Sequence, residues 1–272
     1  MLADHGEGAH LFAGGTAMLL LMRQRILNPS HLVHLGTLRD LEGIRYDDGA
    51  GLRIGTLTRI ADIAEHSAVT TRYPMIAGMA RRVANPQIRN MATIGGNLCH
   101  GDPASDPPAC FIAAGAGVRA VRGRQERMID LDGFYTDSYE IVIAPDEIVA
   151  EILVPPPPPN GVGAYTRFLR TPAEHRPLVG VGVFALRGNG GDVCEDIRIA
   201  VGASTPVPIR LRRAEDLLRG QRVSHDLLEE AADLGAAEIS PLSDFRGAGE
   251  YRREMVRVIV RRTVEAAFAA PR

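Results

Sequence analysis

The sequence predicts an α+β protein with two unequal parts, residues 1–156 and residues 157–272. Strand-like runs and helical patterns are mixed through the first part, whereas in the second part strand-like runs precede helical patterns. Five consecutive prolines, residues 155–159, separate the two patterns. Such a run is a stiff, extended segment that enters neither a helix nor the interior of a sheet. It is typical of a surface loop or of a domain boundary, and we expect a boundary.

In the first part, strands are expected where short apolar runs end at turn residues, and helices where apolar residues recur every three or four positions. Thr16 and Thr58 are expected to cap the helices that follow them, because a threonine hydroxyl can accept a hydrogen bond from a free helix amide. The expected strands are residues 11–13, 32–35, 44–46, 52–57, 118–122, 127–129 and 147–154, and the expected helices are residues 17–27, 59–66 and 73–84. The strands over residues 44–46 and 52–57 are expected to form a hairpin around Asp47-Asp48-Gly49. Residues 85–92 are expected to be irregular, and residues 93–97 to form a glycine turn.

The second part is expected to place its strands first and its helices last. Ser224 is expected to cap the middle helix in the same way. The expected strands are residues 165–170, 179–187 and 197–201, and the expected helices are residues 212–218, 225–234 and 250–268.

Composition excludes several classes of function. The formal net charge is −2, so the chain lacks the basic surplus expected of a nucleic-acid-binding protein. All 31 cationic side chains counted as lysine or arginine are arginine, and without lysine neither a P-loop nor Schiff-base chemistry is available. The longest uncharged apolar stretch near the start, residues 17–22, is far too short to span a membrane.

The three cysteines limit the redox chemistry of the chain. A [2Fe–2S] cluster needs four ligands, so Cys99, Cys110 and Cys194 cannot hold one by themselves. An odd number of cysteines without a signal peptide indicates free thiols in a reducing cytoplasm. We find no metal-ligand spacing and no nucleophile motif, and we therefore assign no metal site and no catalytic residue.

Two glycine pairs, Gly14-Gly15 and Gly95-Gly96, each follow a short apolar step. Paired glycines let backbone N–H groups approach a diphosphate closely, because no Cβ intrudes. A helix beginning at Thr16 would add the positive end of its dipole behind the first pair. Either pair taken alone is more often an ordinary turn.

Two other stretches match the dinucleotide pattern G-x-G-x-x-G/A. Both run into expected strands, whereas the Rossmann fingerprint opens a helix, so we treat both as chance matches. A nicotinamide enzyme of the Rossmann type is therefore disfavoured. The matched residues are Gly115, Gly117 and Ala120 in one stretch, and Gly180, Gly182 and Ala185 in the other.

Residues 85–109, NPQIRNMATIGGNLCHGDPASDPPA, are the most informative stretch. Together with AGGT at residues 13–16 and APDEIVAEILVP at residues 144–155, they closely resemble the FAD-binding medium subunit of the molybdenum hydroxylases, the family of carbon monoxide dehydrogenase and xanthine dehydrogenase. The block TIGGN with an aspartate nine residues after its asparagine is a specific signature. The resemblance covers nearly the whole chain. It implies a two-lobed FAD-binding domain of the vanillyl-alcohol-oxidase (PCMH) type, followed by a small α+β domain like the C-terminal domain of carbon monoxide dehydrogenase flavoprotein.

The resemblance also implies the residues that bind FAD. Asp106 corresponds to the acidic residue that hydrogen-bonds the sugar-like part of FAD, a role that suits a carboxylate because it is purely an acceptor. Asp106 also suits the N-cap of a helix starting at Pro107, and the two roles are compatible. The two pyrophosphate loops correspond to Ala13, Gly14, Gly15, Thr16 and Ala17, and to Thr93, Gly95, Gly96 and Asn97.

Three further positions follow from the resemblance. Val149 corresponds to an apolar residue against the flavin, and Arg167 to a cationic position near the ring or the adenine side. Xanthine-oxidising relatives carry lysine at the latter position, so arginine here leaves the electron acceptor open. His175 falls where some relatives place an aromatic residue beside the ring, and it is equally well interpreted as a surface histidine. Tyr165 and Phe168 are expected to serve the core rather than the flavin.

For the whole assembly, the resemblance implies a cytoplasmic three-subunit oxidoreductase, expected as a dimer of heterotrimers without nucleic acid or a membrane span. A large subunit would carry the molybdenum cofactor, and a small subunit two [2Fe–2S] clusters. Electrons from the clusters would reach FAD in this chain and leave for an external acceptor. Two alternatives stay open: a stand-alone flavin-dependent reductase on the same fold, and a flavin-free assembly subunit. Intact glycine loops and Asp106 argue against the second.

Members of this family usually carry a few more residues before the first glycine loop, which form a strand and a helix. We expect the shorter start of this sequence to weaken the edge of the N-terminal subdomain without removing the loops.

Overall fold

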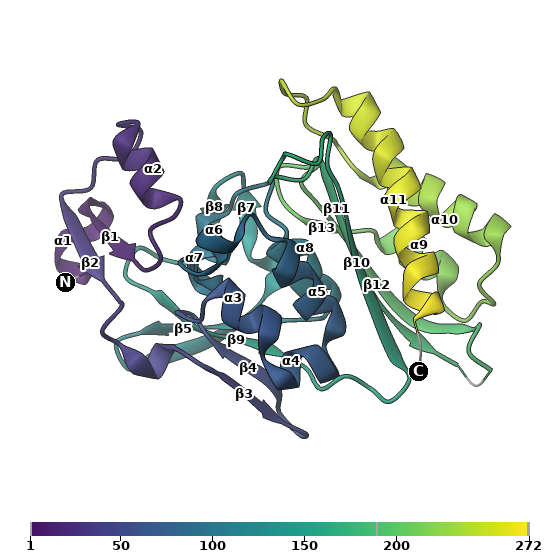
Figure 1. The fold of residues 1–272 in the computed structure, drawn as a ribbon, viewed down its shortest axis with the longest axis horizontal. Coiled ribbons are helices and arrows are strands. Elements are labelled where there is room, and N and C mark those ends of the chain that lie inside the picture. The colour runs from purple at the N-terminus through teal and green to yellow at the C-terminus, as the bar shows by residue number, and fades with distance from the viewer. Residues whose placement is uncertain (1, 189, 271–272) are drawn as a thin grey trace.

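The computed structural model describes residues 2–188 and 190–270 of the chain. Most of the chain forms four layers (Figure 1): a five-stranded sheet, a group of short helices, a four-stranded sheet and a final layer of helices. A small N-terminal part, drawn in purple, lies beside the first two layers (Figure 1). The mixed helix and strand content confirms the predicted fold class.

The five-stranded sheet has the order β3-β4-β9-β5-β6, and every neighbouring pair is antiparallel. The first hairpin turns as expected, because Asp47 Oδ1 accepts hydrogen bonds from the N–H groups of Gly49 and Ala50, both at 2.9 Å. The strands are β3 (Ile44–Asp47), β4 (Gly51–Gly55), β5 (Gly117–Arg122), β6 (Gln125–Asp130) and β9 (Ile148–Val154). A separate two-stranded ladder, reached through a 3₁₀ turn η3 (Leu131–Gly133), is formed by β7 (Tyr135–Asp137) and β8 (Glu140–Ile141).

Six short helices cover one face of this sheet, and two of them also contact the second sheet. Helix α5 packs against β10, and α8 packs against β11 and β12, so the helices form a shared layer between the sheets (Figure 1). The helices are α3 (Ile60–Glu65), α4 (Ser67–Arg72), α5 (Pro74–Arg82), α6 (Pro86–Arg89), α7 (Ile94–His100) and α8 (Pro107–Ala113).

The four-stranded sheet follows the proline run and has the order β10-β11-β12-β13. Its outer face is covered by three helices, and the middle one starts as predicted, with the Ser224 hydroxyl accepting a hydrogen bond from Leu227 N at 3.3 Å. The strands are β10 (Gly161–Phe168), β11 (Val179–Arg187), β12 (Cys194–Gly202) and β13 (Ile209–Arg210), and the helices are α9 (Arg212–Leu218), α10 (His225–Glu238) and α11 (Gly249–Ala269).

The N-terminal part pairs β1 and β2 in a two-stranded parallel sheet. Helix α2 between them buries no side chain, and Leu19 and Leu20 are about half exposed. The elements are α1 (Leu2–His5), η1 (Gly6–Gly8), β1 (Ala9–Phe12), α2 (Met18–Arg23), β2 (His31–His34) and η2 (Arg39–Leu41).

Two of the predicted helix caps are wrong. Helix α2 begins only at Met18, and neither Thr16 nor any other side chain caps it. The Thr58 hydroxyl instead joins Gly43, accepting from its N–H at 2.9 Å and donating to its carbonyl at 3.0 Å. Thr58 therefore ties the β4–α3 turn to the start of β3, and α3 begins without a side-chain cap.

Candidate cofactor-binding site

The first glycine loop, residues 13–17, follows the end of β1 and packs backbone to backbone against another segment. A Cβ on Gly14 would lie 2.1 Å from the Met91 carbonyl oxygen, so only glycine permits this approach. Gly15 adopts the left-handed φ of +68°, which other residues rarely reach. Because Met91 lies two residues before Thr93, the two predicted loops lie side by side.

The N–H groups of the first loop are available to a ligand. Within residues 2–188 and 190–270, the backbone N–H groups of residues 14–18 donate no hydrogen bond. Consecutive free N–H groups at a glycine turn form a concave donor surface suited to an anion. This arrangement fits the pyrophosphate of a dinucleotide without any cationic side chain.

The second glycine pair opens α7, which the sequence predicted only as a turn. The Thr93 hydroxyl caps this helix by accepting from Gly96 N at 3.2 Å, and Gly95 N donates to the Thr56 carbonyl at 2.9 Å. A Cβ on Gly95 would lie 1.6 Å from Thr56 Oγ1, whereas Gly96 is exposed. The two glycines therefore differ: Gly95 packs against the end of β4, and Gly96 faces the surface.

The loop after α7 folds back on the same site. Ser105 Oγ donates a hydrogen bond of 2.7 Å to Asn97 Oδ1, which fixes the amide of Asn97. The next residue is Asp106, so this bond places Asp106 close to the second glycine loop. Ser105 was not predicted as a site residue, because its short polar side chain next to two turns has no distinctive pattern in the sequence.

Asp106 is a buried carboxylate at the boundary of the two sheets, with 3% of its surface exposed. It occupies the N-cap position of α8 with Pro107 following, as the sequence suggested, but its side chain does not cap the helix. Instead, Tyr165 Oη on β10 donates to Asp106 Oδ1 at 2.8 Å. Tyr165 therefore has a polar partner at the site besides its place in the core. Arg167 Nε lies 3.4 Å from the same oxygen.

Burial raises the pKa of Asp106 to about 6, even though the neighbouring Arg167 and the hydrogen bond from Tyr165 favour the charged form. Asp106 therefore changes charge close to neutral pH, where hydroxyl donors of a ligand would stabilise its ionised form.

Arg167 is held at the same boundary by two backbone carbonyls. One terminal nitrogen donates to Arg82 O at the end of α5, and the other donates to His175 O at 2.5 Å. The His175 side chain is exposed. Val149 lies on β9 in the first hydrophobic core with 3% of its surface exposed, so it lines the interior behind the loops.

Residues of the second part also hold the loop that precedes Asp106. Arg176 forms an ion pair with Asp102, and Ala203 N donates to Pro103 O at 2.9 Å. The His100 ring packs against Tyr139, with 5.2 Å between the ring centroids, and burial lowers the pKa of His100. The residues in each of these pairs lie at least 39 positions apart, so no local sequence pattern marks them.

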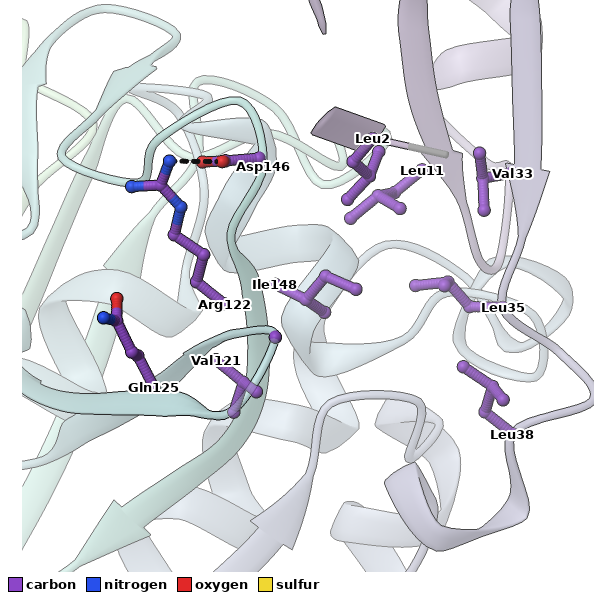
Figure 2. A pocket seen from close by; sticks show the side chains of 11 residues that line it. Leu2, Leu11, Val33, Leu35, Leu38, Val121, Arg122, Gln125, Asp146 and Ile148 are labelled. Atoms are coloured by element: carbon purple, nitrogen blue, oxygen red, sulfur yellow. Dashed lines mark ion pairs between the residues drawn. The ribbon is translucent and has the colours of Figure 1, made fainter. Parts of the chain in front are cut away.

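An apolar hollow of the described chain lies elsewhere. A cavity of about 720 Å³ opens between the N-terminal part and the β5–β6 turn, and apolar side chains such as Leu11, Val33 and Ile148 face into it (Figure 2). At its rim Arg122 pairs with Asp146 at 2.6 Å (Figure 2). It contains none of the predicted site residues. An apolar hollow does not match a charged diphosphate.

Comparisons with known proteins identify the family. Residues 1–157 match the family described as FAD binding domain in molybdopterin dehydrogenase, and residues 164–267 match the CO dehydrogenase flavoprotein C-terminal domain. The chain belongs to the FAD-binding subunits of the molybdenum hydroxylases. This confirms the resemblance and the two-domain fold that it implied. Members are oxidoreductases, and FAD is the cofactor of the matched domain.

Relatives in this family align along nearly the whole chain. The nicotine 6-hydroxylase medium subunit of Paenarthrobacter nicotinovorans is 35% identical, over 98% of this chain and 93% of the relative. The carbon monoxide dehydrogenase medium chain of Hydrogenophaga pseudoflava is 31% identical, over 99% of this chain and 92% of the relative. A solved structure of carbon monoxide dehydrogenase from the same organism, lacking the Mo-pyranopterin moiety, matches with a TM-score of 0.94 at 33% identity, covering 98% of this chain and 92% of that chain.

The described residues show neither a metal site nor a helix that could span a membrane. Across the described residues, no group of three or more His, Cys, Asp or Glu side chains is arranged to hold a metal ion. Nor does any described helix have the length and apolar character needed to cross a membrane. The three cysteines are free, and burial raises the pKa of Cys99 to about 12, which disfavours the thiolate form that binds metals.

Proposed function

We propose that this chain is the FAD-carrying electron-transfer subunit of a heterotrimeric molybdenum-dependent hydroxylase. The single observation that carries the proposal is the run of N–H groups at residues 14–18 that have no partner among the described residues, directly beside the second glycine loop. A glycine turn that runs into a helix leaves consecutive N–H groups without internal partners, and such a run offers an anion several donors on one concave surface.

In this proposal each group of site residues binds a different part of FAD. The first loop, Ala13 to Ala17, would donate to the pyrophosphate, and the exposed Gly96 and the half-buried Asn97 would let the second loop approach it. Asp106 would accept from the sugar-like hydroxyls. Val149 would lie against the flavin, and Arg167 would lie near the ring or the adenine side. Bound FAD supplies the electron transfer itself, and the protein supplies orientation and the surrounding charge.

The remaining redox centres belong to other polypeptides in this proposal. Relatives named medium subunit or medium chain imply larger and smaller companions. We assign the molybdenum cofactor to a large subunit and two [2Fe–2S] clusters to a small one. Electrons would pass from the clusters to FAD here, and then to an external acceptor. We propose a cytoplasmic dimer of heterotrimers that binds no nucleic acid.

We also propose the domain boundary between residues 156 and 157. It falls in the proline run that connects β9 of the five-stranded sheet with β10 of the four-stranded sheet. Such a stiff segment joins two sheets without adding a strand to either.

The proposal is tested by titrating the flavin-stripped full chain with FAD and following the quenching of flavin fluorescence. We expect saturable binding of one FAD per chain, and affinity lowered by roughly 1–3 kcal/mol in Asp106→Ala, the range for a lost charged hydrogen bond. A chain that is folded by circular dichroism but does not bind FAD would refute the proposal. Co-purification with molybdenum- and iron-containing subunits tests the assembly.

A further inference from the structure

The two oxygens of Asp106 have different surroundings. Oδ1 accepts from Tyr165 Oη at 2.8 Å and lies 3.4 Å from Arg167 Nε. Within the described residues Oδ2 has no hydrogen-bond partner, yet it is not among the fully buried polar atoms without a partner. Oδ2 therefore still reaches accessible space. One oxygen is held by the second part of the chain, and the other is left for a ligand.

We propose that Tyr165 is a positioning residue of the cofactor site, whose hydroxyl holds Asp106 Oδ1 so that Oδ2 is presented, ionised, to a sugar hydroxyl of FAD. The inference rests on the proposed function, because it assigns Asp106 to FAD. It goes further in assigning part of the site to β10, a strand outside the first domain.

The sheet is shaped to receive the Tyr165 hydroxyl. A Cβ on Gly180 of β11 would lie 2.4 Å from Tyr165 Oη, so only glycine leaves room for the hydroxyl there. A Cβ on Gly182 would lie 2.7 Å from Ala109 O, so glycine also lets α8 approach β11 closely. Close packing therefore explains Gly180 and Gly182, which match part of a dinucleotide motif in the sequence. They bring Tyr165 and the helix that starts after Asp106 together.

The charges around Asp106 explain why a donor is needed. Desolvation on α8 opposes ionisation of Asp106 and raises its pKa to about 6. Arg167 on β10 and Arg82 at the end of α5 favour the charged form, as does the hydrogen bond from Tyr165. Cys110, one turn along α8, is buried, and its own pKa is raised well above the usual value, so it stays neutral. Removing the Tyr165 hydroxyl therefore shifts Asp106 toward its protonated form.

A protonated Asp106 is a weaker acceptor, so FAD affinity should fall as the pH drops through the pKa of this carboxyl. In Tyr165→Phe we expect this loss to begin about one pH unit higher than in the wild type, which corresponds to about fivefold weaker binding at pH 6. At pH 8.5, where the carboxyl is ionised in both proteins, the two dissociation constants should agree within about twofold.

The experiment measures the FAD dissociation constant of the full chain from pH 5 to pH 8.5. The matched control is Tyr73→Phe: Tyr73 is also a buried tyrosine, with 6% exposure against 8% for Tyr165, and its hydroxyl donates to Pro155 O at 2.9 Å, away from the site. Gly180→Ala is a second variant that displaces the hydroxyl without removing it, and it should reproduce the shift. Asp106→Asn should flatten the profile.

The outcomes are distinct. The inference is supported if the pH at which half of the FAD affinity is lost rises in Tyr165→Phe but not in Tyr73→Phe. A Tyr165→Phe profile that coincides with the wild type, or that is displaced equally at every pH, overturns it while leaving FAD binding intact. If neither variant folds, a wild-type profile that Asp106→Asn leaves unchanged overturns it. Failure of the wild type to bind FAD at any pH instead refutes the proposed function.

Discussion

Gly95 and Gly96 are neighbours in the sequence, but changing each to alanine should affect different properties, the stability of the fold for Gly95 and the affinity for FAD for Gly96. A methyl group on Gly95 would overlap Thr56 Oγ1 and approach the Thr56 carbonyl at 2.9 Å. A methyl group on Gly96 would meet only the Thr93 hydroxyl, at 2.8 Å, which can rotate. We therefore expect Gly95→Ala to lose stability and Gly96→Ala to lose FAD.

The magnitudes follow from the contacts. Over-packing costs about 1–3 kcal/mol, and moving α7 away would also weaken the bond from Gly95 N to Thr56 O, worth about 1 kcal/mol. Replacing a helical glycine by alanine returns about 1 kcal/mol, so Gly95→Ala should lose about 2 kcal/mol net, or roughly 4–8 °C in Tm. In Gly96→Ala the stability gained by placing alanine in a helix and the stability lost by weakening the Thr93 cap nearly cancel, so the free energy of unfolding should hardly change.

The assay is thermal unfolding of the FAD-free chain by circular dichroism, followed by FAD titration of the variants that fold. Gly78→Ala is the control, because Gly78 lies inside α5 with no atom within 4 Å of its Cβ position. Gly96→Ala should keep its Tm within about 2 °C and bind FAD about tenfold more weakly, about 1.4 kcal/mol. A stable Gly95→Ala, or Gly96→Ala with normal FAD affinity, would refute the distinction.

Three more variants test other parts of the structure. Asp106→Asn should stabilise the FAD-free chain, because a carboxyl pKa raised from 3.8 to about 6 gives stability that is complete below pH 3.8 and is lost as the pH rises to about 6. Urea unfolding should therefore show a clearly larger gain in the free energy of unfolding at pH 7.5 than at pH 4.5. Gly14→Ala should separate the two loops and lower the affinity for FAD at least tenfold. Gly133→Ala is the control and should leave this affinity unchanged, because no atom lies within 4 Å of its Cβ position. Arg252→Met should cost about 3 kcal/mol in urea unfolding at pH 7, because the fully buried Arg252 donates to Ala203 O and pairs with Asp244. Burial opposes ionisation of Asp244, but its arginine partners lower its pKa to about 2, so the penalty for Arg252→Met should shrink as the pH falls from 4 toward 2; a constant penalty would contradict this.

Local patterns predicted most of the regular structure. The hairpin around Asp47, the Ser224 cap and the strand over residues 179–187 all depend on neighbouring residues, which a single sequence displays. Helix α7 was missed because two glycines disfavour a helix by about 1 kcal/mol each. The Thr93 cap and packing against Thr56 outweigh that preference, and only the second of these is a long-range contact.

The candidate site was predicted only in part, because contacts between residues far apart in the sequence leave no local pattern. The glycine loops and Asp106 stand in recognisable motifs, and whether they bind FAD stays a prediction. The partner of Asp106 is Tyr165, 59 residues along the chain on another sheet, and nothing near either residue marks the pair. Thr16 was expected to cap a helix, but the loop keeps its amides free and α2 starts later.

Amide hydrogen exchange on the full chain, with and without saturating FAD, tests the central claim most directly. Residues 14–18 have unpartnered N–H groups in the described chain, so they should exchange fast without FAD and become protected when it binds. Residues 209–218, on the far sheet and its helix, serve as the internal reference and should not change. Unaltered exchange at residues 14–18 in the FAD-saturated protein would contradict the account.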